Sequence, residues 1–233
     1  MQTLIHKTAL VINAGDPVGK VVAERLGALG AQVLLHHEAT GCEISQTLST
    51  IRAMGSRAVE IKHDLKSLVK IRDFFGALII SHPVIDILII NGSMTSEAAD
   101  SKDADRKNLF EIFSNASALI NQRGHIIYLS PVIRQVLQTG TPGEFLQDLR
   151  DAILTHSRSI GAKEAVFNTI IPYGLNQDIL QLNQETGSEQ VNFSVHNTLL
   201  KRYTELDDLA NLTEFLASDL SAVISGQYFL TNI

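Results

Sequence analysis

Short apolar runs alternate with longer amphipathic segments along most of this chain, and that alternation restricts the folds it can adopt. The runs at 8–12 and 85–90 are apolar at nearly every position, which is typical of strands buried on both faces of a parallel sheet. Between such runs, apolar side chains recur at helical spacing, as from Val18 to Leu26. The pattern predicts strands at 8–12, 32–35, 58–61, 85–90, 125–129, 165–171 and 226–230, and helices at 17–27, 44–54, 68–81, 103–121, 144–159 and 206–217.

This order of elements predicts the class of fold. Parallel strands need crossover connections, and helical crossovers that are consistently right-handed cover the sheet. The chain is therefore expected to be an α/β protein with a Rossmann-type, doubly wound parallel sheet and helices on both faces. No linker-like tract divides the sequence, so residues 1–233 are expected to form a single domain. The polar, irregular stretch 174–203 is expected to form a lid segment.

Composition and charge argue against several classes of function. A formal net charge of -6 does not suit a nucleic-acid-binding surface, and no apolar stretch is long enough to span a membrane. The lone Cys42 provides neither an internal disulfide nor a cysteine metal site, and the histidines show no metal-ligand spacing. The N-terminus runs directly into a strand without a signal-peptide core. A cytoplasmic protein without a metal is expected.

Several motifs occur together in the second half of the chain and around its fourth expected strand. They are LDDLA at 206–210, FLASD at 215–219, ISGQ at 224–227, FNTIIP at 167–172 and DILI at 86–89. These segments resemble the "PEEVA", "FLASD", "ITGQ", "VNAVAP" and "DILVNNAG" elements of the short-chain dehydrogenase/reductase family. The chain is most similar to the β-ketoacyl-ACP reductase branch. The resemblance implies a Rossmann fold, NAD or NADP as cofactor, and a contact between Asp64 and adenine.

The loop after the first expected strand departs from this family. The family's "TGxxxGxG" loop lets backbone amides approach the cofactor pyrophosphate at a helix N-terminus. The matching stretch, INAGDPVG at 12–19, keeps Gly19 but has Asn13 and Pro17 in place of the first two glycines. Proline removes an N–H donor, and the side chain of Asn13 is expected to restrict the tight turn. Gly15 and Gly19 are the glycines left to hold a cofactor.

Asp16 and Pro17 also form a good helix start, because Asp is a preferred N-cap and Pro is favoured at the first helical position. We expect the Asp16 carboxylate to occupy the helix N-terminus that a phosphate would otherwise use, and its charge to repel a dinucleotide. This interpretation predicts that no cofactor binds. The alternative is that Gly15 supplies enough freedom for NAD or NADP to bind.

Two further positions bear on the cofactor. The second expected strand is followed by His36, His37 and Glu38, which match neither the acidic NAD pattern nor the basic NADP pattern of the family. The paired histidines are expected to be ordinary loop surface. Asn91 matches the second asparagine of the family's "NNAG" element and is expected to brace the cofactor loop.

The chemistry of the family uses a serine, a tyrosine, a lysine and an asparagine, and two of these are missing here. The lysine matters because a free phenol titrates near pH 10 and is a poor acid-base group at neutral pH. Family spacing back from Asn168 places the tyrosine and lysine near Pro142 and Leu146, and no lysine occurs at 109–162. Ser130 is a match to the serine, although Pro131 competes for that position.

Asn108 and Asn115 are rival matches to the family's asparagine. Glu144, Arg150 and His156 lie on the expected helix 144–159 and are weighed as replacement acid-base groups, against their simpler interpretation as solvated helix residues.

These departures predict a catalytically degenerate member of the family. Such a chain would act as a structural or regulatory subunit, either in a homo-oligomer or in a hetero-oligomer with an active paralogue. The alternative is a divergent NAD(P)-dependent oxidoreductase, ketoreductase-like, with an acyl-thioester substrate. A third interpretation is a module that binds a small ligand without turnover.

Overall fold

One parallel sheet organises the protein. The computed structural model describes residues 3–38, 44–92, 102–130, 151, 155, 160–172, 175 and 200–231. In this part of the chain, seven strands pair in the order β3-β2-β1-β4-β5-β6-β7, and every pair is parallel. The strands are β1 (Thr8–Ile12), β2 (Gln32–His37), β3 (Ala58–Lys62), β4 (Ile85–Asn91), β5 (Ile120–Leu129), β6 (Val166–Ile171) and β7 (Gln227–Leu230). The strand order changes direction between β1 and β4, which confirms the doubly wound topology.

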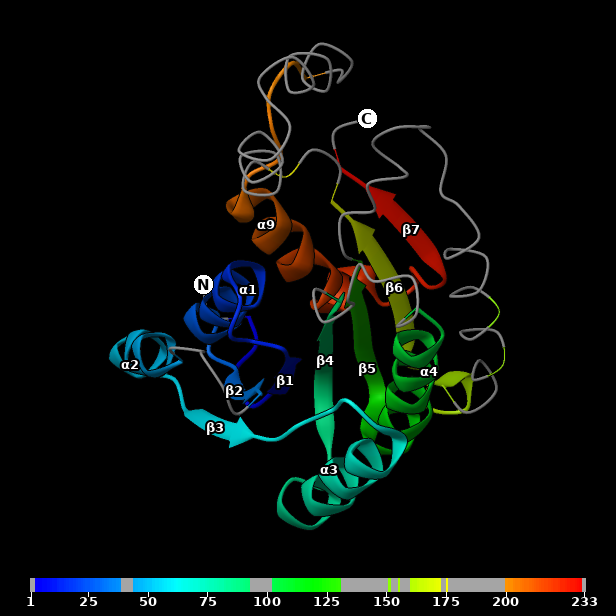
Figure 1. Cartoon of the computed structure of the whole chain (residues 1–233). Coiled ribbons are helices and arrows are strands. Elements are labelled where there is room, and N and C mark those ends of the chain that lie inside the picture. The colour runs from blue at the N-terminus through cyan, green and yellow to red at the C-terminus, as the bar shows by residue number, and fades with distance from the viewer. Residues whose placement is uncertain are drawn as a thin grey trace, which may run out of the picture.

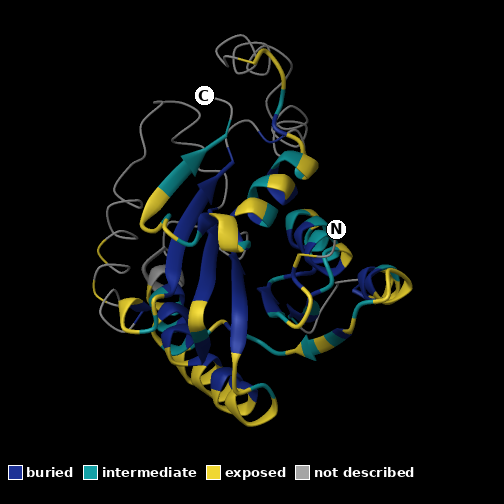
Figure 2. Ribbon diagram, turned by 180° about the vertical axis from the view of Figure 1, so that it is seen from behind, coloured by how far each residue is buried: buried dark blue, intermediate teal, exposed yellow. Residues whose placement is uncertain are grey.

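Helices cover both faces of this sheet, as expected from the sequence (Figure 1). One face carries α1 (Pro17–Ala28), α2 (Ser45–Ala53) and α9 (Leu206–Leu216), and the other carries α3 (Leu68–Ser81) and α4 (Lys102–Leu119). The buried side chains of the helices pack with those of the strands into two apolar clusters, one on each side of the sheet. Figure 2 shows the central strands almost wholly buried, whereas the helices expose their outer sides.

Local sequence explains where the helices begin. The Asp16 carboxylate accepts a hydrogen bond from the Gly19 amide, and Pro17 fills the first position of α1, so both expected features of this N-terminus are confirmed. Ser67 caps α3 in the same manner by accepting from the Lys70 amide. These side chains satisfy amide groups that a helix leaves without an intrahelical partner.

Asp86 joins three segments at the amino ends of the strands. This residue is 9% exposed; its Oδ2 accepts from the Thr8 amide at 2.8 Å and its Oδ1 accepts from the Asn121 side chain at 2.7 Å. Asp86 thereby holds together the starts of β1, β4 and β5.

The expected and observed elements differ at particular ends. β2 continues two residues past its expected end, through His36 and His37, and β5 begins at Ile120 instead of His125. Pairing with neighbouring strands lengthens both elements, because Ile120 pairs with Ile85 and the two histidines pair with β3. The expected helix 144–159 and nearly all of the expected lid segment 174–203 lie outside the described residues. Among the described residues, no helix is long and apolar enough to cross a membrane, and no group of acidic, histidine and cysteine side chains is placed to hold a metal.

Candidate functional site

The candidate site lies at the carboxyl ends of β1 and β4. These two strands are neighbours, with Ile12 opposite Ile90, and they stand where the strand order changes direction. In open α/β sheets, ligands bind beside the carboxyl ends of strands at this point. The chain leaves β1 through the turn 13–16 into α1, and β4 ends at Asn91. The turn and Asn91 therefore form the floor of the candidate site.

The Asp16 carboxylate is fixed at the N-terminus of α1 by two donors from different elements. Its Oδ1 accepts from the Gly19 amide at 2.7 Å and from Nδ2 of Asn91 at 2.6 Å. The same Asn91 amide also lies 3.2 Å from the Asn13 carbonyl oxygen, to which it donates. Asn91 is 4% exposed, so these bonds satisfy a buried group. The expectation that Asn91 braces the loop agrees with this geometry.

The turn after β1 has a backbone conformation that is typical of glycine. Asn13 adopts a left-handed backbone conformation with φ 57°, which asparagine tolerates better than most residues. The expected restriction of the turn by the Asn13 side chain is therefore not what the structure shows. Gly19 is required by packing, because a Cβ there would lie 2.4 Å from the Asn13 carbonyl oxygen. Gly15 is buried within the turn.

The amide groups of this loop are largely committed to acceptors within the chain. Asn13 donates its N–H to Nδ1 of His36 at 3.2 Å, and Ala14 donates to the His36 carbonyl oxygen at 2.8 Å. Gly19 donates to Asp16, and Pro17 has no N–H. A pyrophosphate needs several such donors and no fixed carboxylate beside them. The amides of Asn13, Ala14 and Gly19 therefore already have acceptors within the chain, and a pyrophosphate at the start of α1 would have to displace the Asp16 carboxylate.

The paired histidines are part of the sheet and buried, so the expectation that they are loop surface was wrong. His36 is 0% exposed and His37 is 5% exposed, because both belong to β2 and pair with β3. Nε2 of His36 donates to the His63 carbonyl oxygen at 3.1 Å, and the ring packs edge-on against Phe74 with centroids 5.0 Å apart. Burial lowers the pKa of His36 to about 4. The imidazole is therefore neutral at physiological pH.

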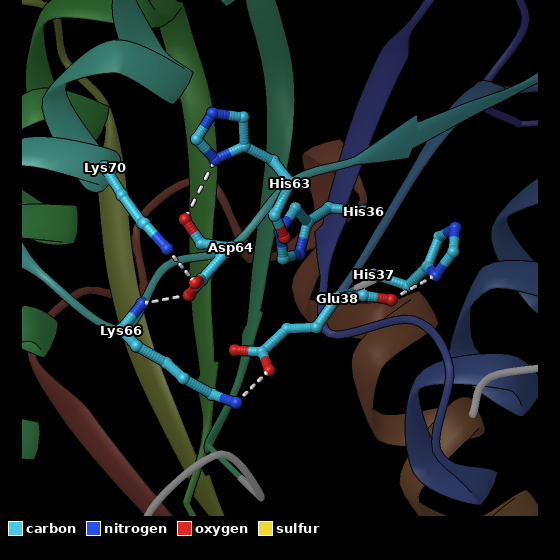
Figure 3. A network of polar contacts seen from close by, with 7 residues as sticks. All are labelled: His36, His37, Glu38, His63, Asp64, Lys66 and Lys70. Carbon is cyan, nitrogen blue, oxygen red and sulfur yellow. Dashed lines mark hydrogen bonds and ion pairs between the residues drawn. The ribbon is translucent and has the colours of Figure 1, made fainter. Parts of the chain in front are cut away.

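Two ion pairs lie just after the carboxyl ends of β2 and β3. Figure 3 shows the ammonium groups of Lys66 and Lys70 directed at the carboxylates of Glu38 and Asp64, respectively. The distance from Lys66 Nζ to Glu38 Oε2 is 2.9 Å, and Asp64 also accepts from the Lys66 amide at 2.8 Å. The hydrogen bonds from Lys70 and from the Lys66 amide lower the pKa of Asp64. The carboxylate expected at an adenine contact thus already has two partners within the chain.

The two candidate asparagines of α4 share one side of that helix, because they are seven residues apart. Nδ2 of Asn115 donates to the Glu111 carbonyl oxygen at 2.8 Å and to the Glu111 carboxylate at 3.1 Å. That carboxylate also pairs with Arg72 of α3 at 2.6 Å. Asn115 is thereby engaged at the α3–α4 contact, and Asn108 is half-buried two turns earlier.

Ser130 follows β5 and is 3% exposed, with its amide donating to the Ile170 carbonyl oxygen at 2.9 Å. Positions 142 and 146, expected to hold the catalytic tyrosine and lysine, lie outside the described residues. The first lysine after that gap is Lys163, whose ammonium donates to the carbonyl oxygens of Ala118 and Ile120 at 2.8 Å each. These contacts place Lys163 at the C-terminus of α4, beside the amino ends of β5 and β6 and at the opposite end of the strands from the candidate site.

Tyr128 of β5 is the one tyrosine between 108 and 162 in the sequence, and it lies inside the core. Its ring packs edge-on against Phe113, with centroids 5.9 Å apart, and burial raises the pKa of its phenol. A raised pKa is the opposite of what a proton-transfer group needs at neutral pH.

Comparison with known proteins agrees with this fold and strand order. Residues 14–232 match the family model described as enoyl-(acyl carrier protein) reductase. The chain is 25% identical to the short chain dehydrogenase/reductase nsrJ of Aspergillus novofumigatus, over 95% of this chain and 92% of that protein. The protein belongs to the short-chain dehydrogenase/reductase family.

Other members of the short-chain dehydrogenase/reductase family are similarly distant. The 3-oxoacyl-[acyl-carrier-protein] reductase FabG of Staphylococcus epidermidis is 22% identical over 98% of both chains. A Burkholderia cenocepacia protein whose crystal structure contains NADP superposes with a TM-score of 0.81 at 21% identity, covering 100% of this chain and 94% of that one. At this identity the superposition shows the shared fold.

Within this family member, sequence reasoning missed the contacts that brace the site. His36 holds the loop after β1, and Lys66 pairs with Glu38, yet neither was expected to act there. The signal available for His36 was its place directly after an apolar run, since a residue that extends a buried strand is buried with it.

Proposed function

We propose that this short-chain dehydrogenase/reductase is catalytically degenerate and serves as a structural or regulatory subunit, either in a homo-oligomer or beside an active paralogue. The observation that carries the proposal is the Asp16 carboxylate, which accepts a hydrogen bond from the Gly19 amide at the start of α1. A phosphate brought to this amide meets a fixed negative charge in a partly buried position. The chain thus supplies its own anion where a dinucleotide would bring one.

The catalytic side of the site supports the same proposal. Pro142 and Leu146 stand in the sequence where the family has its tyrosine and lysine. Tyr128 is buried with a raised pKa, and Lys163 is engaged at the amino ends of the strands, away from the candidate site. None of these groups offers the proton transfer that ketone reduction needs.

Association with another chain is supported by apolar side chains around β7, the last strand in the order of the described sheet. Its side chains Tyr228, Phe229 and Leu230 are only half-buried, and Leu220 and Val223 of the segment before it are 81% and 94% exposed. A partner that covers β7 and this segment would bury these apolar side chains.

A second candidate function is a divergent NAD(P)-dependent oxidoreductase that is ketoreductase-like and acts on an acyl thioester. This candidate is favoured by the left-handed backbone at Asn13 and by the close packing of the Asn13 carbonyl oxygen against Gly19. The loop has thereby kept a tight backbone conformation that is compatible with a nearby ligand. In this second candidate, the chain would bind NAD or NADP with Asp16 displaced from α1.

Calorimetric titration with NADH and with NADPH separates the two candidates. The chain has no tryptophan, so energy transfer from indole to the nicotinamide is not a usable signal and heat is the safer readout. We expect no binding by the wild-type protein at millimolar cofactor. Micromolar binding would contradict the degenerate site and favour the oxidoreductase.

Two variants make the titration specific for the carboxylate. Asp16→Gly removes the charge but keeps a residue that is tolerated as an N-cap, so loss of the cap should cost only a few tenths of a kcal/mol. Loss of the hydrogen bond from the buried Asn91 side chain should cost about 1–3 kcal/mol more. We expect this variant to gain weak cofactor binding. Ser67→Gly removes the equivalent cap from α3 and is expected to gain no cofactor binding.

Sedimentation analysis of the wild-type protein tests the oligomer: a chain that stays monomeric and joins no paralogue contradicts the subunit role.

A further inference from the structure

The last two residues of β2 are buried histidines that project from opposite faces of the sheet. Successive side chains of a strand alternate between its two faces, so His36 and His37 have separate surroundings. His36 lies on the side of α3, against the Phe74 ring. His37 lies apart from His36 in Figure 3, and its Nε2 is 2.8 Å from the Glu60 carboxylate of β3. The two adjacent histidines therefore have different hydrogen-bond partners.

The partners of His36 require a neutral ring. The Asn13 amide can only donate, so Nδ1 of His36 accepts this hydrogen bond and carries no proton. The His63 carbonyl oxygen can only accept, so Nε2 of His36 carries the proton and donates. A second proton on His36 would place two donors face to face at Asn13.

The partners of His37 lie away from that turn. Its Nδ1 lies 2.8 Å from the Glu38 carbonyl oxygen, and its Nε2 lies 2.8 Å from the Glu60 carboxylate. The contact between the end of β2 and the turn after β1 therefore runs through His36.

We propose that His36 is a pH-responsive group at the end of β2: its two partners hold the ring neutral, and proton uptake by His36 releases the turn between β1 and α1. Among the described residues, the titratable groups that act on His36 are His37 on its own strand and His63 after β3. The charged group bonded to His37 is Glu60.

The released turn is the one that carries the Asp16 contact. Asn13 is held by His36 through its amide and by Asn91 through its carbonyl oxygen. Acid that protonates His36 removes the first of these two bonds and leaves the second. The geometry at the start of α1 thereby becomes dependent on pH. This inference concerns the free chain and stands apart from the proposed function.

Nuclear magnetic resonance of ¹⁵N-labelled protein tests the protonation state of His36, through correlation of the imidazole nitrogens between pH 8 and pH 5. At pH 7.5 we expect a proton on Nε2 alone of His36. His36→Gln deletes one set of signals and so assigns it. A His36 ring that carries protons on both nitrogens at pH 7.5, or a single proton on Nδ1, would overturn the proposal.

Hydrogen exchange at the Asn13 amide tests the release of the turn. A group that titrates near pH 6.5 when exposed and near pH 4 when buried makes local opening about 20-fold easier at pH 5 than at pH 7. After correction for intrinsic exchange rates, Asn13 protection should fall by about that factor. Glutamine can accept from Asn13 and donate to His63 but does not titrate, so His36→Gln should show no such fall. Equal protection at both pH values in the wild-type protein would contradict the release.

Discussion

Gly19 and Gly76 are both glycines within helices, yet their surroundings give opposite predictions for the same substitution. A Cβ at Gly19 would lie 2.4 Å from the Asn13 carbonyl oxygen, whereas nothing lies within 4 Å of a Cβ at Gly76. Gly19→Ala should therefore lower the free energy of unfolding by about 1–3 kcal/mol through overpacking. Gly76→Ala should raise it by about 0.5–1 kcal/mol, since alanine favours the helix. Urea denaturation of both variants decides, and equal effects would show that contact at Gly19 is unimportant.

At the scale of single residues, the sequence predicted the contacts that form between residues close together in the chain. The Asp16 cap and Pro17 were predictable, because the capping partner Gly19 is three residues away. The second bond of that carboxylate was not, because Asn91 lies 75 residues along the chain. The left-handed turn at Asn13 likewise depends on bonds from two other strands.

The strands depend on contacts at both of their ends, and Asp86 makes the contacts at the amino ends. Asp86→Ala removes the carboxylate that accepts hydrogen bonds from the Thr8 amide and the Asn121 side chain. Both donors then lose this acceptor. We expect a loss of about 2–3 kcal/mol in the free energy of unfolding, as for hydrogen bonds to a charged group. Chemical denaturation measures it. Asp73→Ala, on the exposed side of α3, is the control and should change stability by no more than about 0.5 kcal/mol.

Elements with strong periodicity were predicted closely, and their ends were less certain. β1 and α3 begin and end at the expected residues. β2 was predicted too short, because histidine is polar and the apolar pattern stops at Leu35, although pairing with β3 carries the strand to His37. The sheet register, set by neighbouring strands, decided that end.

For the whole molecule, the buried neutral His36 predicts a loss of stability in acid. Its pKa is lowered to about 4 in the folded protein, compared with about 6.5 in an unfolded chain, so the unfolded state takes up the proton first. The stabilisation is complete well above pH 6.5 and declines as the pH falls from 6.5 towards 4. Between pH 7 and pH 5, this one group should remove about 2 kcal/mol from the free energy of unfolding.

Denaturation at both pH values, with His36→Gln as the matched variant, isolates that contribution. The variant should lose less stability in acid than the wild-type protein by about 2 kcal/mol. The carboxyl groups of Asp64 and Asp208 have lowered pKa values caused by Lys70 and Arg202, so their stabilisation is present above about pH 4 and is lost below it. An identical acid response in both proteins would show that His36 is not the group responsible.

The sequence by itself determined the α/β class, the doubly wound sheet, and the residues that depart from the family's cofactor and catalytic motifs. Apolar periodicity and helix caps are local signals, so these properties can be derived from adjacent residues. The tertiary structure alone decided that Asn91 also holds the Asp16 carboxylate, that Glu38 and Asp64 pair with lysines, and that His36 and His37 are buried with different partners. The physical reason is that hydrogen-bond partners and burial come from segments far apart in the chain, which only the folded sheet brings together.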